Sequence, residues 1–295
     1  MTPKERYFWD LNGHLILRGV LTKGELDEAN AAIDACADRI SPGEPNRLSR
    51  GSESLQGLGR PGLRGTQLLN IEKPHCEIFR RMLIHPAIIS RLRVMCGIGF
   101  RLDHGPQFIG GVKGTSGHRL HGSGAPHKPF VGYNHQSGDP YVGGVTVSWQ
   151  LAEVIENNGG FACVPCSHKS NFDPPDGVTS CDDHMGTVIQ PAAQPGDVVF
   201  FMDGAQTHGT FPWRNEHERR SILFKFASRT CARTGPTGEV APPDIYWDEE
   251  IIDDMTEEQK AVMWGPYSGH GGKVPLLVVN ASGAVGLEGG TDIDP

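Results

Sequence analysis

Two histidines and one arginine, far apart in the sequence, are of residue types that could build a metal site. His121 lies in the run RLHGS, and His208 lies in THG shortly after the apolar run PGDVVFF. Arg219 begins the alternating run RRSILFKF. A histidine at the end of one strand and an arginine at the start of the next can point into the same barrel mouth. Imidazoles are common metal ligands, and a guanidinium can bind a carboxylate through two parallel hydrogen bonds.

The elements that must position these residues are mostly short strands. Apolar runs with β-branched residues recur from residue 100 onwards and are separated by turn residues at short intervals, which is typical of a β-sandwich or barrel. We therefore predict a mainly β fold with flanking helices. The predicted strands are Phe100–Leu102, Gln107–Val112, Val145–Leu151, Gly160–Pro165, Thr187–Gln190, Asp197–Met202 and Arg220–Phe226.

Two helical regions precede the strands. Asn12–Leu21 is predicted to form a short apolar strand, after which Thr22 and Glu25 form the capping-box pattern of a helix N-terminus. The following run has apolar residues at helical spacing and is predicted to be a helix. A second helical region spans residues 75–96 and is interrupted near Pro86.

The chain is expected to form a single domain, 1–295, with two less regular regions. Residues 41–70 are rich in Gly, Ser and Arg, and we interpret them as a lid loop beside a cleft, or alternatively as a solvated surface loop. Residues 235–295 are Pro-rich and then acidic, and are expected to form a C-terminal extension. The arginines of the expected lid loop are Arg47, Arg50, Arg60 and Arg64.

Several runs of this sequence resemble the phytanoyl-CoA dioxygenase-like family of iron(II)- and 2-oxoglutarate-dependent oxygenases. The resemblance runs from NGHLILRGVL, through RLHGS, VTVSWQL and ENNGGFACVPCSHK, to PGDVVFF, His208 and Arg219. It covers most of the chain, although Cys166 stands where the family has a glycine. The resemblance implies a double-stranded β-helix (jelly-roll) core with iron at its open end.

The resemblance also implies the cofactors and the residues that bind them. His121 and His208 match the two histidine ligands of iron(II), and 2-oxoglutarate and O₂ would take the remaining positions. Arg219 matches the arginine that binds the distal carboxylate of 2-oxoglutarate, and Ser221 on the same strand face is expected to add a hydroxyl. Trp149 is expected to be an apolar wall residue near the cofactor.

The sequence departs from the family pattern at the carboxylate ligand, because Ser123 stands where the family has an aspartate. One interpretation is a halogenase, in which chloride binds the iron in the place of the missing carboxylate and an unactivated carbon is chlorinated. A second is a hydroxylase in which another acid, such as Asp139, serves as ligand. A third is a catalytically inactive binding relative. Ser123 is therefore treated as a catalytic position beside His121 and His208.

Two further signals are interpreted as structural. His118 stands three residues before His121, and this odd spacing predicts that its side chain lies on the opposite face of the strand. Cys163 and Cys166 form a CxxC pair, but a zinc site needs a second, properly spaced pair, so we expect core residues.

The substrate is expected to be a free-standing small molecule. The arginines before the barrel favour an anionic compound, and a nucleotide would satisfy this requirement. Flat aromatic and cationic side chains just beyond His208 could form the roof of the substrate site. The candidate substrate residues are Arg60, Arg64, Trp213 and Arg214.

Composition excludes other classes of protein. The formal net charge of −8 argues against a broad nucleic-acid surface, and no apolar run approaches the about 20 residues needed to span a bilayer. The 7 cysteines are irregularly spaced and fit reduced thiols. We therefore expect a cytoplasmic enzyme that requires iron(II), 2-oxoglutarate and O₂, with chloride if it is a halogenase, and no nucleic-acid polymer or membrane as partner.

Overall fold

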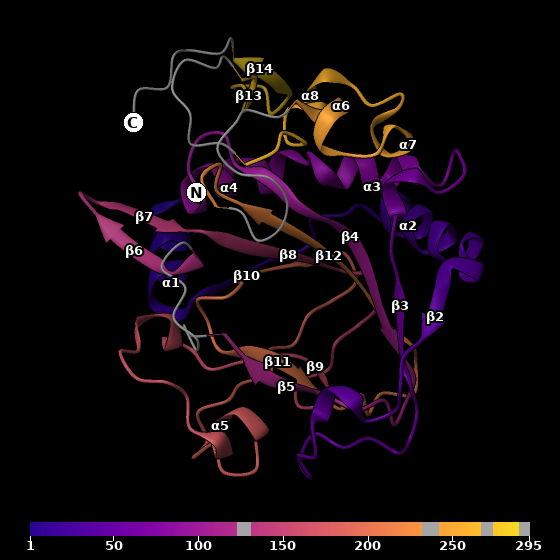
Figure 1. The fold of residues 1–295 in the computed structure, drawn as a ribbon, viewed down its shortest axis with the longest axis vertical. Coiled ribbons are helices and arrows are strands. Elements are labelled where there is room, and N and C mark those ends of the chain that lie inside the picture. The colour runs from indigo at the N-terminus through magenta and orange to yellow at the C-terminus, as the bar shows by residue number, and fades with distance from the viewer. Residues whose placement is uncertain (123–130, 232–241, 267–273, 289–295) are drawn as a thin grey trace.

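Two antiparallel sheets face each other in the middle of the molecule (Figure 1). The computed structural model describes residues 1–122, 131–231, 242–266 and 274–288, so Ser123 lies outside the described residues. The larger sheet has the order β1-β10-β8-β12-β4-β3-β2, and the smaller has the order β5-β11-β9. This arrangement confirms the predicted mainly β class.

The strands are short except for the two in the middle of the larger sheet. The larger sheet contains β1 (His14–Leu17), β2 (Ile40–Pro42), β3 (Gly62–Gly65), β4 (Arg101–Gly111), β8 (Gly144–Gln150), β10 (Val198–Met202) and β12 (Arg219–Ala227). The smaller contains β5 (His118–His121), β9 (Gly160–Cys163) and β11 (His208–Phe211). Two hairpins lie apart, β6 (Tyr133–Gln136) with β7 (Asp139–Val142), and β13 (Leu276–Val279) with β14 (Val285–Glu288).

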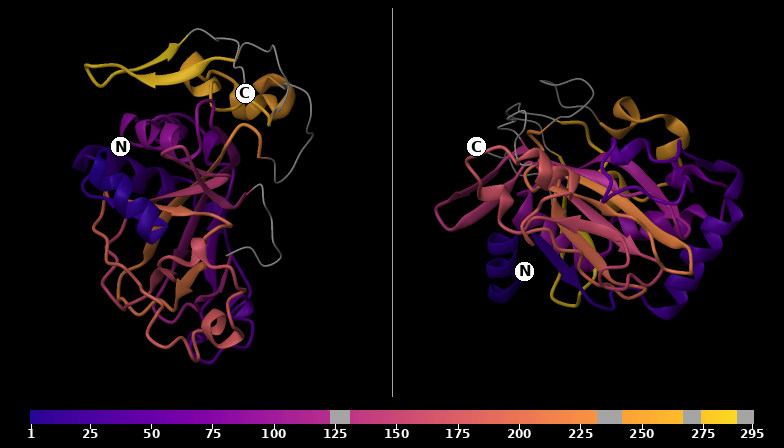
Figure 2. Two further views of the ribbon diagram at one scale, coloured as in Figure 1. Left: turned by 90° about the vertical axis from the view of Figure 1, so that its left-hand side faces the viewer. Right: turned by 90° about the horizontal axis from the view of Figure 1, so that it is seen from below.

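Helices cover the face of the larger sheet that is turned away from the smaller one (Figures 1 and 2). Ile33, Phe79 and Ile88 of these helices belong to one buried core together with Trp149 and Phe224 of the sheet. The helices are α1 (Pro3–Asn12), α2 (Lys23–Ala35), α3 (Cys76–Leu83) and α4 (Pro86–Met95); short helices are α5 (Asp176–Ser180), α6 (Pro243–Tyr246), α7 (Glu249–Ile252) and α8 (Glu257–Lys260), with 3₁₀ turns at Ala37–Arg39, Arg47–Ser49, Leu68–Asn70 and Ser167–Lys169.

The predicted helix starts follow from local chemistry. At α2 the Thr22 side chain accepts a hydrogen bond from the Glu25 backbone, and the Glu25 carboxylate accepts one from the Thr22 backbone, which confirms the capping box. The same reciprocal pair, Thr2 and Glu5, begins α1, which the sequence analysis missed. The second helical region is divided into α3 and α4, as the proline predicted.

Some predicted boundaries are wrong. Phe100–Leu102 and Gln107–Val112 are not separate strands but parts of β4, which continues through the residues between them because β12 pairs along its length with a local irregularity. Thr187–Gln190 forms only an isolated bridge, between Cys163 and Ile189. Among the described residues, no helix is both long and apolar enough to cross a membrane.

The region 41–70 is less loop-like than expected. Its first residues belong to β2, residues 62–65 form β3, these two strands pair with each other, and β3 also pairs with β4 in the larger sheet. The C-terminal region contributes Val262 and Met263 to the same core as the helices, and it lies at the end of the molecule away from α5 (Figure 2).

The core between helices and sheet should dominate stability. Phe224 on β12 is fully buried, whereas Phe172 is 83% exposed. We expect Phe224→Ala to lower the free energy of unfolding by about 3–5 kcal/mol, because it removes a packed aromatic ring and leaves a cavity. Urea denaturation followed by circular dichroism measures the change. The control Phe172→Ala should change it by less than about 0.5 kcal/mol, and an equal effect of both variants would contradict the packing described.

Candidate active site

Strand pairing brings the two predicted histidines together. In the antiparallel pair of β11 and β5, His208 is directly opposite His121, and the centroids of the two imidazole rings are 4.4 Å apart. Phe201 of β10 packs against His208 with ring centroids 4.7 Å apart. Two residues that are far apart in the chain thus share one site.

Both imidazoles are held in the tautomer that a metal requires. Nδ1 of His208 lies 2.8 Å from the carbonyl oxygen of Gln206, and Nδ1 of His121 lies 3.1 Å from that of Arg119. A carbonyl oxygen can only accept, so each Nδ1 carries the proton and each Nε2 keeps its lone pair.

Burial keeps both rings neutral. It lowers the pKa of His208 to about 3, with a further contribution from His121, and it also lowers the pKa of His121. A neutral imidazole is the form that binds a metal ion. The local structure therefore suits a metal at the two Nε2 atoms.

The prediction that His118 lies on the opposite face is wrong. Its ring centroid is 4.5 Å from that of His121, and both side chains line the same cavity. The cause is an irregularity in the pairing: His208 is opposite His121 and Thr210 is opposite His118, so two steps on β11 match three on β5. This extra residue re-aims the side chain, as a β-bulge does. Burial, followed by the neighbouring His121, lowers the pKa of His118 to about 3.

A cavity of about 170 Å³ lies between the two sheets at this point. Its wall includes His121, His208, Arg219, Ser148 and Phe161. Phe161 stacks on Phe201 with ring centroids 4.6 Å apart, which gives the cavity one apolar side.

Arg219 has the charge and the unpaired donor that binding of an anion requires. Burial and the nearby charge of Arg64 lower its pKa to about 10, so the guanidinium stays positively charged at neutral pH. Its Nε is buried and has no hydrogen-bond partner among the residues that the structure describes. A buried donor without a partner is costly, and a carboxylate in the cavity would remove this cost.

The other expected cofactor residues lie further from the cavity. Ser221 is on the same face of β12 as Arg219, but its hydroxyl donates to the side-chain carbonyl of Gln150 at 3.1 Å. Trp149 is fully buried on the helix side of the larger sheet, where its ring is 5.6 Å from that of His85. Side chains alternate along β8, so Ser148 faces the cavity in its place.

The four candidate substrate residues are divided. Arg64, on β3, lines the cavity. The backbone of Arg60 instead forms an isolated β-bridge with that of Thr115. Trp213 is buried with its indole N–H donating to the carbonyl of His217 at 2.7 Å, and together with Arg214 it lines a separate hollow.

Asp203 and Lys225 were not singled out from the sequence, yet they lie beside the two histidines. The Lys225 ammonium is 3.2 Å from Oδ2 of Asp203, and Oδ1 of Asp203 is 3.8 Å from Nε2 of His208. The available signal was the alternation in β12, which places Lys225 on the same face as Arg219. Asp139, by contrast, is exposed in β7 and lies 3.9 Å from Arg6.

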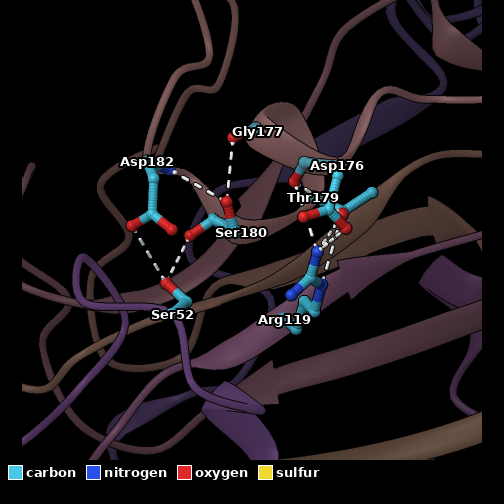
Figure 3. A network of polar contacts seen from close by, with 7 residues as sticks. All are labelled: Ser52, Arg119, Asp176, Gly177, Thr179, Ser180 and Asp182. Atoms are coloured by element: carbon cyan, nitrogen blue, oxygen red, sulfur yellow. Dashed lines mark hydrogen bonds and ion pairs between the residues drawn. The ribbon is translucent and has the colours of Figure 1, made fainter.

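A polar network fixes the outer side of β5 (Figure 3). Arg119 forms an ion pair with Asp176 and donates to Thr179, both at α5. Nearby, the Ser52 hydroxyl donates to the carbonyl of Ser180 at 2.5 Å. The strand that carries His121 and the region 41–70 are therefore both attached to the α5 segment.

One family comparison covers the segment that contains this site. Residues 119–221, about a third of the chain, match the phytanoyl-CoA dioxygenase family (PhyH), and this segment contains both histidines and Arg219. No curated protein sequence matches the chain.

Solved structures share the fold. HygX from Streptomyces hygroscopicus, with nickel and 2-oxoglutarate bound, has a TM-score of 0.64 at 19% identity, covering 80% of this chain and 90% of HygX. The 2-oxoglutarate-dependent carbocyclase SnoK from nogalamycin biosynthesis has a TM-score of 0.54 at 16% identity, covering 78% and 85%. The epimerase SnoN has 0.53 at 16%, covering 77% and 82%.

The fold is thus that of the jelly-roll oxygenases. The PhyH match across the histidines and Arg219 confirms the predicted enzyme class, a non-haem iron- and 2-oxoglutarate-dependent dioxygenase-type enzyme.

Metal binding should depend on the facing histidines. We expect His121→Ala and His208→Ala each to weaken binding of nickel(II) by more than the about 10- to 100-fold that loss of an outer-shell partner costs. Isothermal titration calorimetry under anaerobic conditions measures the affinity. His135→Ala is the control, because His135 is exposed on β6. Retention of full affinity by both cavity variants would contradict this site.

Arg219 should control the affinity for 2-oxoglutarate. Arg219→Lys loses one of two parallel charge-assisted hydrogen bonds, so we expect the dissociation constant of the nickel-loaded protein for 2-oxoglutarate to rise about 10- to 100-fold. Arg220→Lys is the matched control, because Arg220 pairs with Asp34 and Glu218 instead. Calorimetry compares the two variants, and equal effects would argue against this role of Arg219.

Proposed function

We propose that this protein is an iron(II)- and 2-oxoglutarate-dependent hydroxylase of a small molecule. One observation carries the proposal: two neutral imidazoles line the same cavity as the half-buried Arg219, whose buried Nε has no hydrogen-bond partner among the described residues. These are the donor types that iron(II) and a dicarboxylate cosubstrate require.

The residues would divide the work as follows. His121 and His208 would hold the iron, and Arg219 would hold the distal carboxylate of 2-oxoglutarate. When bound, iron and 2-oxoglutarate supply the activation of O₂ that oxidises a C–H bond. Phe161 and Phe201 form an apolar wall that excludes water from this side of the cavity.

Chlorination is the second candidate, and it is favoured by Ser123. A protonated hydroxyl is a poor iron ligand, so a chloride ion could take the place of the missing carboxylate and supply its negative charge. Hydroxylation is preferred because a buried carboxylate, Asp203, already lies beside His208. The negative charge that balances the metal ion therefore need not come from a halide.

The proposed substrate is an anionic small molecule, for which a nucleotide is one suitable class. Arg64 lines the cavity from β3 and is exposed to solvent. Arg50 is close enough that its charge acts on both His118 and His121. Arg64 in the cavity wall and the nearby charge of Arg50 would suit a substrate that carries a phosphate or carboxylate group.

Chloride binding separates the candidates before any substrate is known. Iron(II) with bound 2-oxoglutarate has a visible charge-transfer band, which is recorded anaerobically during titration with sodium chloride, using sodium nitrate as the ionic-strength control. For a hydroxylase we expect a band that chloride leaves unchanged. A saturable shift that Ser123→Asp abolishes would instead establish the halide site. Absence of the band in the wild-type protein would mean an inactive relative.

A further inference from the structure

His118 is a third imidazole in the cavity, and the proposed binding of iron and 2-oxoglutarate does not use it. Its ring lies against that of His121, with centroids 4.5 Å apart and an angle of 35° between the ring planes. Its side chain forms no hydrogen bond with any residue that the structure describes. Because the imidazole is half-buried in the cavity wall, it can donate a hydrogen bond to a bound molecule.

The local sequence holds His118 in this orientation. Thr210, directly opposite on β11, accepts a hydrogen bond from the backbone N–H of His118 through its hydroxyl oxygen at 3.0 Å. Gly209 allows the strands to approach, because a Cβ atom there would lie 2.4 Å from the carbonyl oxygen of His118. At Gly117 a Cβ atom would lie 2.3 Å from the carbonyl oxygen of Thr210. These residues maintain the bulge, and bulges that re-aim a side chain are frequent next to active sites.

The cavity wall is cationic, although the whole chain has a formal net charge of −8. Its described lining includes the cations Arg64, Arg219 and Lys225 and contains no aspartate or glutamate. Lys225 already pairs with Asp203 at 3.2 Å, and Arg219 would bind 2-oxoglutarate. Arg64 forms no ion pair with any described residue. The cavity therefore has the charge to accept a second anion besides 2-oxoglutarate.

Arg64 and His118 belong to opposite walls of the cavity. Arg64 is on β3 of the larger sheet, whereas His118 is on β5 of the smaller sheet. Burial is the main cause that lowers the pKa of His118, and the charge of Arg64 adds to it, so the two side chains are near each other. The hydroxyls of Ser116 and Thr210 also line the cavity. These groups can all donate hydrogen bonds to an anion.

The arrangement of these donors favours a phosphate group over a carboxylate. A phosphate ester has three strong acceptor oxygens that point in different directions, so it can accept hydrogen bonds from both walls at once. The two oxygens of a carboxylate lie in one plane and suit a single guanidinium, as proposed for Arg219. Donors from two facing sheets are therefore the better match for a tetrahedral anion.

We propose that Arg64 and His118 form a subsite for a phosphate group, so that the substrate is a phosphorylated small molecule. Arg64 would supply the positive charge, and His118 would donate a hydrogen bond from the facing wall. Thr210 would act as a positioning residue, because it holds the backbone of His118. The inference rests on the proposed function, because it assumes that Arg219 is occupied by 2-oxoglutarate. It narrows the substrate from anionic molecules in general to phosphate esters.

The test measures phosphate binding and not activity. Inorganic phosphate is titrated with zinc(II)-loaded protein that is saturated with 2-oxoglutarate, and the ³¹P NMR line width reports the bound fraction. We expect saturable binding by the wild type, with acetate a weaker competitor than sulfate. Arg64→Met should weaken phosphate binding by at least about 10-fold, because a charge-assisted hydrogen bond is lost. Arg60→Met is the matched control, because it removes the same charge from a residue outside the cavity lining.

His118 is tested through its capacity to donate a hydrogen bond. His118→Phe keeps a flat ring but removes the N–H, and it should weaken phosphate binding by about 10-fold. His118→Gln supplies an amide donor and should recover part of the affinity. Equal losses in both variants would mean that His118 only supports the bulge, and this outcome would overturn its role in binding. Thermal denaturation shows whether each variant is folded at the temperature of the titration.

The outcomes separate this subsite from the proposed function. Calorimetry on the same variants should show an unchanged affinity for 2-oxoglutarate. Full phosphate binding in Arg64→Met and His118→Phe, with loss in His121→Ala, would place phosphate on the metal and refute the subsite. A wild type that binds 2-oxoglutarate but not phosphate would also refute the subsite and leave the proposed function intact. A wild type that binds neither metal nor 2-oxoglutarate would refute the proposed function, and this assignment of the substrate with it.

Discussion

The pairing of β11 with β5 is the constraint on which the site depends. Neither strand is long, and each is held on both sides: β11 also pairs with β9, and β5 is attached through Arg119 to the α5 segment. Opposite positions in an antiparallel pair bring side chains within about 4.5–5.5 Å, a separation that two ligands of one metal can use. The pairing of the two strands therefore brings the two histidines together, as a tight loop does for the ligands of many other metal sites.

The larger sheet contributes charged side chains to the cavity, whereas the smaller sheet contributes neutral histidines. Side chains along β12 alternate, so that Ile222, Phe224 and Phe226 pack on the helices while Arg219 and Lys225 face the cavity. One strand thus contributes to the hydrophobic core on one face and to ion binding on the other. The helices are needed for this division because they cover the apolar face, while pairing with β4 and β8 sets the register of the strand.

The sequence was sufficient for whatever depends on local patterns. Thr22 and Glu25 predicted the start of α2, and turn residues predicted the separation of the strands. The resemblance pointed to His121, His208 and Arg219, which line one cavity in the structure. The failures have a common cause, which is that tertiary pairing decides where a side chain points. The bulge in β5 exists only in relation to β11, so the periodicity that placed His118 on the far face could not include it. Likewise, a large aromatic side chain such as Trp149 or Trp213 suits a core position as well as a cavity wall, and only the packing shows that both lie outside the cavity. Asp203 became noticeable only through its distances to His208 and Lys225.

The incorporation of β3 into the larger sheet has a consequence for how this enzyme could diversify. Arg64 stands on a hydrogen-bonded strand opposite Ile109, so the wall that it forms is part of the scaffold. A wall of this kind cannot be lengthened or shortened without disturbing β4, the neighbour on which β12 also depends. New substrate preferences would therefore arise by exchange of individual side chains on β3 and not by a change in the length of this strand.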